Sequence, residues 1–227
     1  MPEEQDHNSS TVTAVVEALD QSDSFEAVSR ILASGEPDQI MACFHDMVRE
    51  LFSQRKLPQM IWIGRAGVEY ALRESQADAR KLSYNVSSNL WPGWGDDAVT
   101  PTASDLQAAL DLARLHLRLV VEEKLDPESV GNARWLVGAQ RLAVGQEQAA
   151  HHAFETAKAA YNEAGRPAHE WMAEGFLSLS LQLMGTMATE GQRRFENALG
   201  ELKQLGDDGE FFADQLQTAK RVFLKRG

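Results

Sequence analysis

The chain has 227 residues, a formal net charge of −12 at pH 7 and a single cysteine, Cys43. Hydrophobic residues make up 43% of it and charged residues 25%, which is typical of a folded globular protein and not of a disordered one. A lone cysteine excludes an internal disulfide framework and a four-cysteine metal site. The excess of acids argues against a nucleic-acid partner and against an anionic membrane surface.

The hydropathy of the chain and the charge of its first residues indicate where in the cell the protein is expected. No apolar run reaches the length of about 18 residues that could cross a bilayer, and the chain begins with acids rather than with a basic signal-peptide start. We therefore expect a cytoplasmic protein with no membrane partner. Residues 1–10 lack apolar periodicity and are predicted to form a flexible acidic tail, followed by a single helical repeat domain over residues 11–227.

Apolar residues recur every three or four positions along most of the chain, which is the spacing of one face of an α-helix. No segment shows a sustained alternation of β-branched residues, so strands are not predicted. The predicted helices cover residues 11–20, 24–33, 37–54, 58–74, 76–91, 102–123, 127–144, 146–164, 167–187, 189–205 and 209–225. Most connections between them are short, which makes consecutive helices antiparallel.

The local signals at the helix ends agree with these boundaries. Thr102 and Asp105 have the spacing of a reciprocal capping box, and Asp126 precedes a proline that suits a first helical turn. Gly145 and Gly165 fall where helices are predicted to stop.

Residues 92–101 form the only long connection with an ordered composition. Trp91 and Trp94 flank a Pro-Gly turn, and Asp96 and Asp97 follow it. The two indoles and two carboxylates could form an aromatic platform with acceptors for a ligand. They could equally cover the ends of neighbouring helices as a plug, and the large area that a tryptophan buries favours the plug.

Two segments of the chain resemble one another, and their pattern resembles a known family. Residues 154–165 and 195–206 share Phe, Glu, Ala and Gly at the same places, 41 residues apart. The first copy resembles a tetratricopeptide repeat, with the family's small, turn and aromatic positions at Gly138, Gly145, Ala150, Phe154 and Ala157. It departs from the family pattern at Arg134, Arg141 and Asn162, where the family prefers two aromatics and a proline.

The resemblance implies an all-α fold. The expected architecture is a right-handed superhelical array of antiparallel helix hairpins, a tetratricopeptide-like α-solenoid closed by a C-terminal capping helix over residues 209–225. A helical hairpin in another α-fold is the alternative. In such an array each hairpin buries its apolar face against the next.

The sequence carries no recognisable catalytic or cofactor motif. It lacks a nucleophile elbow, a phosphate-binding glycine loop and a paired-histidine zinc motif, so no enzyme activity, cofactor or metal is predicted. His151 and Glu155 lie four residues apart on a polar helix face, and His116 lies within a helix; we interpret them as surface polarity. Cys43 lies in an apolar helical setting that is typical of a buried, inert thiol.

The family's usual function is to bind a peptide in the groove lined by the first helix of each hairpin. By this resemblance residues 131–144 would present Asn132, Trp135, Ala139 and Leu142 to the groove. The predicted binding residues are Asn85, Asn89, Trp91, Trp94, Asn132 and Trp135. The basic clamp by which some members hold a terminal carboxylate has no counterpart at the matched positions, so a chaperone-tail ligand is not expected. The acidic balance of the chain, with Asp96 and Asp97 close to the tryptophans, favours a basic or neutral segment over an acidic one.

Two functions follow from this pattern. The first is a non-enzymatic scaffold or adaptor that binds a protein or peptide partner in its groove. The alternative is a helical small-molecule sensor whose pocket is roofed by residues 92–101. A panel of metabolites would distinguish them, because only a sensor should gain thermal stability from one.

Overall fold

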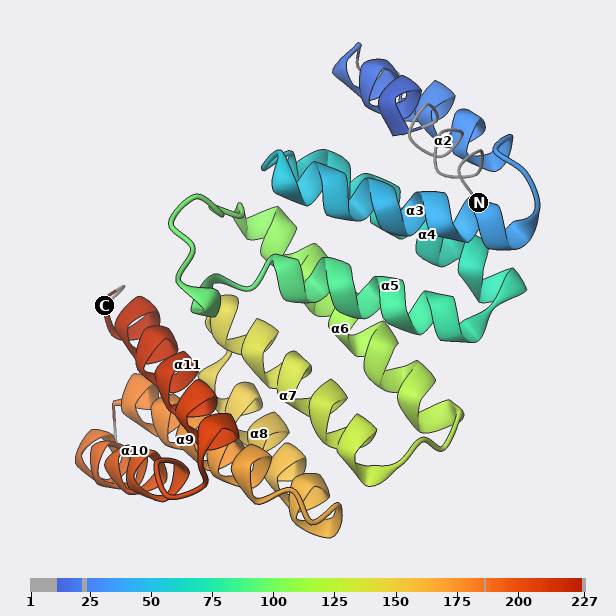
Figure 1. Cartoon of the computed structure of the whole chain (residues 1–227). Coiled ribbons are helices and arrows are strands. Elements are labelled where there is room, and N and C mark those ends of the chain that lie inside the picture. Colours follow the sequence, from blue (N-terminus) through green and yellow to red (C-terminus); the bar gives the residue numbers. More distant parts are fainter. Residues whose placement is uncertain (1–11, 22–23, 186, 226–227) are drawn as a thin grey trace. The chain divides into compact units, whose positions relative to one another are not determined.

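The computed structural model describes residues 12–21, 24–185 and 187–225, and within them it contains helices and turns but no strand (Figure 1). Residues 12–20 are helical. The further elements are α2 (Ser24–Leu32), α3 (Pro37–Ser53), α4 (Leu57–Glu74), α5 (Gln76–Asn89), the 3₁₀ turn η1 (Pro92–Trp94), α6 (Ala103–Glu122), α7 (Pro127–Ala143), α8 (Glu147–Glu163), α9 (Pro167–Met184), α10 (Ala188–Leu202) and α11 (Asp207–Leu224). The predicted helices are confirmed as elements, with ends that differ by up to three residues. The predicted tail over residues 1–10 lies outside the described residues.

The backbone divides into two compact units, Met1–Asn89 and Leu90–Gly227. In the N-terminal unit α3 packs on α4, α4 packs on α5, and α2 packs on α3. Gly67 of α4 allows close packing against α5 and α3. A Cβ there would lie 2.6 Å from a methyl carbon of Leu82 in α5 and 2.8 Å from the Phe44 ring in α3. The single domain predicted over residues 11–227 stays a prediction.

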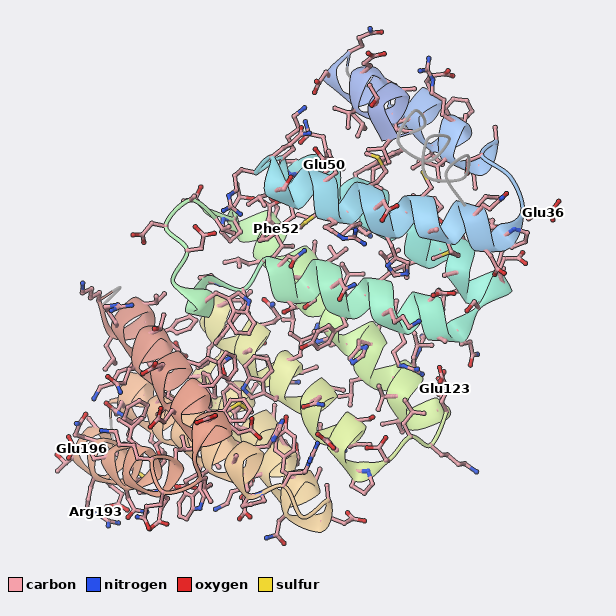
Figure 2. All side chains as sticks on the ribbon, viewed as in Figure 1. Glu36, Glu50, Phe52, Glu123, Arg193 and Glu196 are labelled. Atoms are coloured by element: carbon pink, nitrogen blue, oxygen red, sulfur yellow. The ribbon has the colours of Figure 1, made fainter. Side chains whose placement is uncertain are left out.

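The C-terminal unit is a continuous array in which each helix from α6 to α11 packs against the next. α11 also packs on α9 and on η1, and its Leu216 lies over Gly175 of α9. α11 is the predicted capping helix. On the outer side of α10, Arg193 and Glu196 are exposed and project away from the array (Figure 2).

The repeat motif makes the contacts that its residue types predict. A Cβ at Gly138 of α7 would lie 2.6 Å from Cε1 of Phe154, so the phenyl ring of α8 packs directly on the α7 backbone. Phe154, Ala150 and Ala157 have no exposed surface. Phe195 of α10, which corresponds to Phe154 in the second copy of the motif, is 1% exposed. Small residues therefore let the two helices approach, and a large ring fills the remaining space.

Two departures from the repeat pattern have structural explanations. Arg141 uses its guanidinium to bridge its hairpin, with Nη1 donating to the Ala149 carbonyl oxygen at 2.8 Å. Asn162 stands where the family has a proline, and its Nδ2 donates to Oε2 of Glu170 at 3.0 Å across the turn between α8 and α9. Both side chains hold a turn by hydrogen bonds where the family relies on ring packing or on proline stiffness.

Four helix ends share one turn geometry, in which a residue of left-handed conformation follows the helix. Gly145 (φ 72°) and Gly165 (φ 65°) were predicted at such positions, but Arg55 (φ 59°) and Lys124 (φ 53°) adopt the same conformation without being glycine. In each case the amide of the next residue donates to the carbonyl five positions earlier, as in the bond from Gln146 to Arg141.

The predicted caps are confirmed at both positions that the structure describes. Thr102 accepts from the Asp105 amide while Asp105 accepts from the Thr102 amide, which is a reciprocal capping box. At the start of α7 the Asp126 carboxylate accepts from the backbone amide of Ser129. That bond, followed by the Ser129 hydroxyl, lowers the pKa of Asp126.

Candidate interaction site

Within the C-terminal unit, the segment between η1 and its neighbours is held in place by one tryptophan, Trp91. Trp91 is 1% exposed, and its indole Nε1 donates to the Ala139 carbonyl oxygen of α7 at 3.0 Å. Gly93 is required because a Cβ there would overlap the Trp91 ring, and Gly95 ends the 3₁₀ turn with φ of 74°. The turn is therefore held in one place by a buried side chain on one side and by backbone geometry on the other.

Trp91 is the centre of an aromatic cluster that joins η1, α7, α9 and α11. Its ring centroid lies 4.9 Å from that of Trp94, 5.3 Å from Trp135, 5.7 Å from Phe176 and 6.2 Å from Phe223. The first three pairs are T-shaped, the geometry that the ring quadrupoles favour. Because of these contacts, the turn at residues 92–94 packs on α7 as an ordered layer of aromatic rings.

Burial separates the three predicted tryptophans into two roles. Trp91 and Trp135 are 1% and 5% exposed, whereas Trp94 is 40% exposed. The rings of Trp91 and Trp135 thus support the turn from beneath, as the plug interpretation expects. Their role as contacts of a partner stays a prediction. The same holds for Ala139 and Leu142, which are 0% and 4% exposed. Of these three tryptophans, only Trp94 presents its indole to solvent.

The three predicted asparagines lie in different surroundings. Asn85 is exposed on α5, and Asn89 is half-buried with its Nδ2 3.8 Å from Sδ of Met60. Both belong to the N-terminal unit. Asn132 belongs to the C-terminal unit, where its Oδ1 accepts from the Tyr161 hydroxyl at 2.8 Å and so couples α7 to α8. A common binding role for these asparagines stays a prediction.

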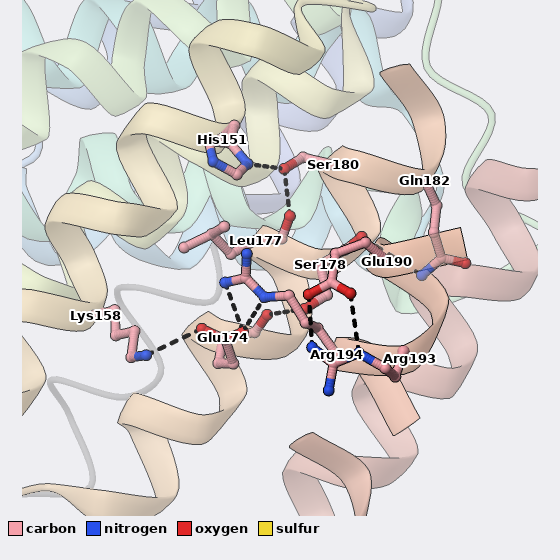
Figure 3. A network of polar contacts seen from close by, with 10 residues as sticks. All are labelled: His151, Lys158, Glu174, Leu177, Ser178, Ser180, Gln182, Glu190, Arg193 and Arg194. Atoms are coloured by element: carbon pink, nitrogen blue, oxygen red, sulfur yellow. Dashed lines mark hydrogen bonds and ion pairs between the residues drawn. The ribbon is translucent and has the colours of Figure 1, made fainter. Parts of the chain in front are cut away.

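A buried carboxylate in the C-terminal unit was not found from the sequence. Glu174 of α9 has 8% of its side chain exposed, with Lys158 of α8 at 3.0 Å from Oε2 and Arg194 of α10 at 2.7 Å from Oε1 (Figure 3). Two cations thus neutralise one buried acid and bridge three consecutive helices. The signal in the sequence is a lone charge within the otherwise uncharged run of residues 172–181, all of which are buried in the structure.

The histidine and cysteine candidates have structural partners. His151 lies with Nδ1 2.9 Å from Oγ of Ser180, and that hydroxyl donates to the Leu177 carbonyl oxygen at 2.6 Å (Figure 3). The hydroxyl proton is therefore directed away from the imidazole, so the pair is not arranged as nucleophile and base. Cys43 is fully buried, and burial, with a smaller effect of the Asp46 carboxylate, raises the pKa of its thiol to about 11. His116 is 8% exposed, which corrects its interpretation as surface polarity.

Across the described ranges no group of three or more His, Cys, Asp or Glu side chains is placed to hold a metal ion. A search of the same residues finds no helix both long and apolar enough to cross a membrane.

Comparison with solved structures places this geometry in a known architecture. The chain is similar to a crystal structure from Podosopora anserina described as a kinesin light chain with nearly identical TPR-like repeats, with a TM-score of 0.58 and 14% identity over 87% of this chain and 96% of that one. A point variant of that protein gives a TM-score of 0.58 and 15% identity, covering 86% of this chain and 94% of the other. The fold is a tetratricopeptide-like helical repeat array. No family model and no curated protein matches the sequence.

Proposed function

We propose that this protein is a non-enzymatic interaction scaffold, or adaptor, that binds a peptide or a segment of a protein partner at the tryptophan turn of its C-terminal unit. We define the tryptophan turn as residues 91–97. Helical repeat proteins of this fold typically mediate protein interactions. The observation that carries the proposal is Trp94, a 40% exposed indole that rests on buried rings.

The support beneath Trp94 makes it suitable as an anchor. Binding interfaces concentrate their energy in aromatic residues that are already held in position, since little conformational entropy is then lost on binding. Trp94 contacts Trp91 at 4.9 Å and Trp135 at 6.1 Å between ring centroids, so its ring is held from two sides while one face stays accessible.

The charge around the turn favours a basic or neutral segment. Asp96 and Asp97 are exposed and follow Trp94 in the chain, and the Arg221 guanidinium of α11 would lie 3.9 Å from a Cβ at Gly95. The two exposed carboxylates lie within a chain of net charge −12. An acidic ligand would meet repulsion, and a basic one would be attracted. Asn85 and Asn89 of α5 remain proposed contacts of a partner.

A peptide library displayed on phage and selected on the full chain tests this proposal. The best peptide is synthesised, and its affinity is measured by calorimetry for the wild type and for Trp94→Ala. We expect a loss of affinity of at least about 10-fold, because an aromatic anchor is removed. Trp62→Ala is a matched control, since Trp62 of α4 is also 40% exposed but lies in the N-terminal unit.

Two results would overturn the proposal. One is a selected peptide that binds Trp94→Ala as tightly as the wild type. The other is a chain that selects no peptide but gains thermal stability from a metabolite panel, which would favour the small-molecule sensor instead.

A further inference from the structure

The last helix of the C-terminal unit, α11, has one continuous exposed face. Its opposite face is buried, because α11 packs on α9, α10 and η1. On the outer side, exposed residues recur at alternating steps of four and three positions, so they share one face of the helix. We define this face as the outer stripe, which consists of Glu210, Asp214, Gln217, Arg221 and Leu224.

Charge is segregated along the outer stripe. Glu210 and Asp214 lie in its first half, whereas Arg221 lies in its second half with the exposed Lys225 beside it. No acid follows Asp214 in the sequence. The remaining base of the helix, Lys220, is turned towards α10, where its ammonium lies 4.7 Å from the centre of an aromatic ring. The outer stripe therefore has an acidic end and a basic end.

The helix dipole explains only part of this segregation. A helix favours acids in its first turn and bases in its last turn, and the effect does not extend further inwards. Asp214 lies about two turns inside α11, where the dipole gives it no advantage. Asp214 also follows Glu210 by four positions, as Lys225 follows Arg221, and like charges at that spacing repel one another. A partner with opposite charges would relieve both repulsions.

Two large apolar side chains accompany the charges, one near each end of the outer stripe. Phe211 is 64% exposed and Leu224 is 39% exposed. The Phe211 ring is supported, because its centroid lies 5.4 Å from that of Phe212. Phe211 and Leu224 are separated by about 20 Å along the helix axis. Single exposed apolar residues are ordinary, but here two of them share a surface with ordered charges of both signs.

We propose that the outer stripe is the interface of a homodimer, in which α11 of two copies pack antiparallel about a two-fold axis near Gln217. Such an interface must be self-complementary, because both copies contribute the same surface. The antiparallel direction brings complementary residues of the two copies opposite one another: Asp214 and Arg221, Glu210 and Lys225, Phe211 and Leu224. A parallel direction would instead place like charges together.

The order of the charges is the reason to expect a second copy rather than another protein. A segment that fits the outer stripe needs bases opposite one end and acids opposite the other, with an apolar group at each end. α11 itself, when reversed, has these groups at the required spacing. This inference goes beyond the proposed function and does not depend on it.

The tryptophan turn borders the outer stripe without covering it. Thr218, which packs against Gly95 of the turn, is half-buried, whereas the neighbouring Gln217 is exposed. An interface of one helix per copy is small, so we expect a dimer that dissociates on dilution.

Sedimentation velocity of the full chain tests the dimer. The concentration is varied from about 1 µM to about 200 µM, the range expected for an interface of this size. We expect the wild type to change from monomer to dimer across it. Asp214→Arg and Arg221→Asp should each weaken dimerisation by at least about 10-fold, because each substitution occurs twice and brings like charges together.

The double variant Asp214→Arg/Arg221→Asp is the decisive comparison. It exchanges the two charges, so opposite charges face each other again and most of the lost affinity should return. Glu163→Arg is the matched control, since it makes the same change of charge at an exposed position of α8 and should leave dimerisation unchanged. Far-ultraviolet circular dichroism checks that each variant keeps its helix content.

Cross-linking tests the position of the two-fold axis. Gln217→Cys should be joined to its equivalent in the second copy by a short bis-maleimide, because both residues lie at the axis. Gln204→Cys, which is exposed in the turn before α11, should not be joined, because it lies far from the axis. The native Cys43 is fully buried and does not compete for the reagent.

Four results would overturn the inference. They are a chain that stays monomeric at every concentration, a single charge variant that dimerises as tightly as the wild type, a double variant that dimerises no better than the single variants, and a Gln217→Cys chain that is not cross-linked. Peptide binding at Trp94 is measured separately, so none of these results decides the proposed function.

Discussion

At the scale of single residues, the contact between Gly138 and Phe154 is the one on which the repeat depends. Phe154→Ala should lower the free energy of unfolding by about 3–5 kcal/mol, because it empties a fully buried ring position. Gly138→Ala should cost about 1–3 kcal/mol by overpacking, since its Cβ would lie 2.6 Å from that ring. Urea unfolding measures both.

Gly200 of α10 is the matched control for Gly138. It is also a helical glycine, in the last turn of α10, but a Cβ there meets nothing within 4 Å. Gly200→Ala should therefore stabilise the protein by about 0.5–1 kcal/mol through helix propensity alone. Equal effects at the two positions would show that the close approach at Gly138 has no energetic importance.

His169 gives the stability of the C-terminal unit a dependence on pH. Its ring lies 5.1 Å from Tyr161 and 4.8 Å from Phe212, and burial lowers the pKa of His169 below its ordinary value, against smaller opposing effects of Glu128 and Asp208. The unfolded chain therefore takes up this proton at a higher pH than the folded chain does. The stability that neutral His169 contributes is complete above about pH 6.5 and is lost as the pH falls below it.

The variant His169→Gln isolates this effect. Urea unfolding between pH 7.5 and pH 5.5 should show the wild type losing more stability than the variant, so that their difference narrows as the pH falls. Parallel curves would mean that His169 does not titrate differently in the folded and unfolded states.

At the scale of elements, the helix ends at Arg55 and Lys124 are strained where Gly145 and Gly165 are not. A left-handed conformation costs an ordinary residue about 1 kcal/mol relative to glycine. Arg55→Gly and Lys124→Gly should each stabilise the protein by about that amount in thermal unfolding. Gly165→Ala is the reverse control: nothing lies within 4 Å of its Cβ position, so any loss of stability reports conformation alone.

The helices themselves could be predicted from the sequence, and their ends less well. Apolar spacing reflects a geometric period, so it placed the ends of α7 and α8 to within one residue. The predicted helix over residues 76–91 instead ends at Asn89. Beyond that end, the indole of Trp91 donates a hydrogen bond to the Ala139 carbonyl oxygen, 48 positions away in the sequence. No local pattern encodes such a contact.

The candidate site was only partly predictable for the same reason. The loop, its two tryptophans and the two aspartates that follow them can be recognised in the sequence. The burial of Trp91 depends on contacts with Phe176 and Phe223, which belong to helices distant in the sequence. The partners of Glu174 lie 16 and 20 positions away from it. Spacing of that kind carries no periodic signal, so the ion cluster could not be derived.

At the scale of the whole molecule, the array should unfold in more than one step. Contacts in repeat proteins are mainly between neighbours, and the described backbone divides into two units. Thiol labelling of buried Cys43 reports on the N-terminal unit, and emission from Trp91, Trp94, Trp135 and Trp171 reports mainly on the other. We expect the two probes to show different urea midpoints; superimposable transitions would instead indicate one cooperative domain.

The ion cluster around Glu174 also bears on how the chain avoids folding incorrectly. Hairpins of similar shape offer similar apolar faces, so a helix could pair with the wrong neighbour, or with its equivalent in another copy of the chain. A buried carboxylate is tolerated only where its cations meet it, and Lys158 and Arg194 reach Glu174 only when α8, α9 and α10 stack in their own order. A helix stacked against the wrong neighbour would leave that charge buried and uncompensated, so the cluster makes incorrect stacking orders less stable than the native one.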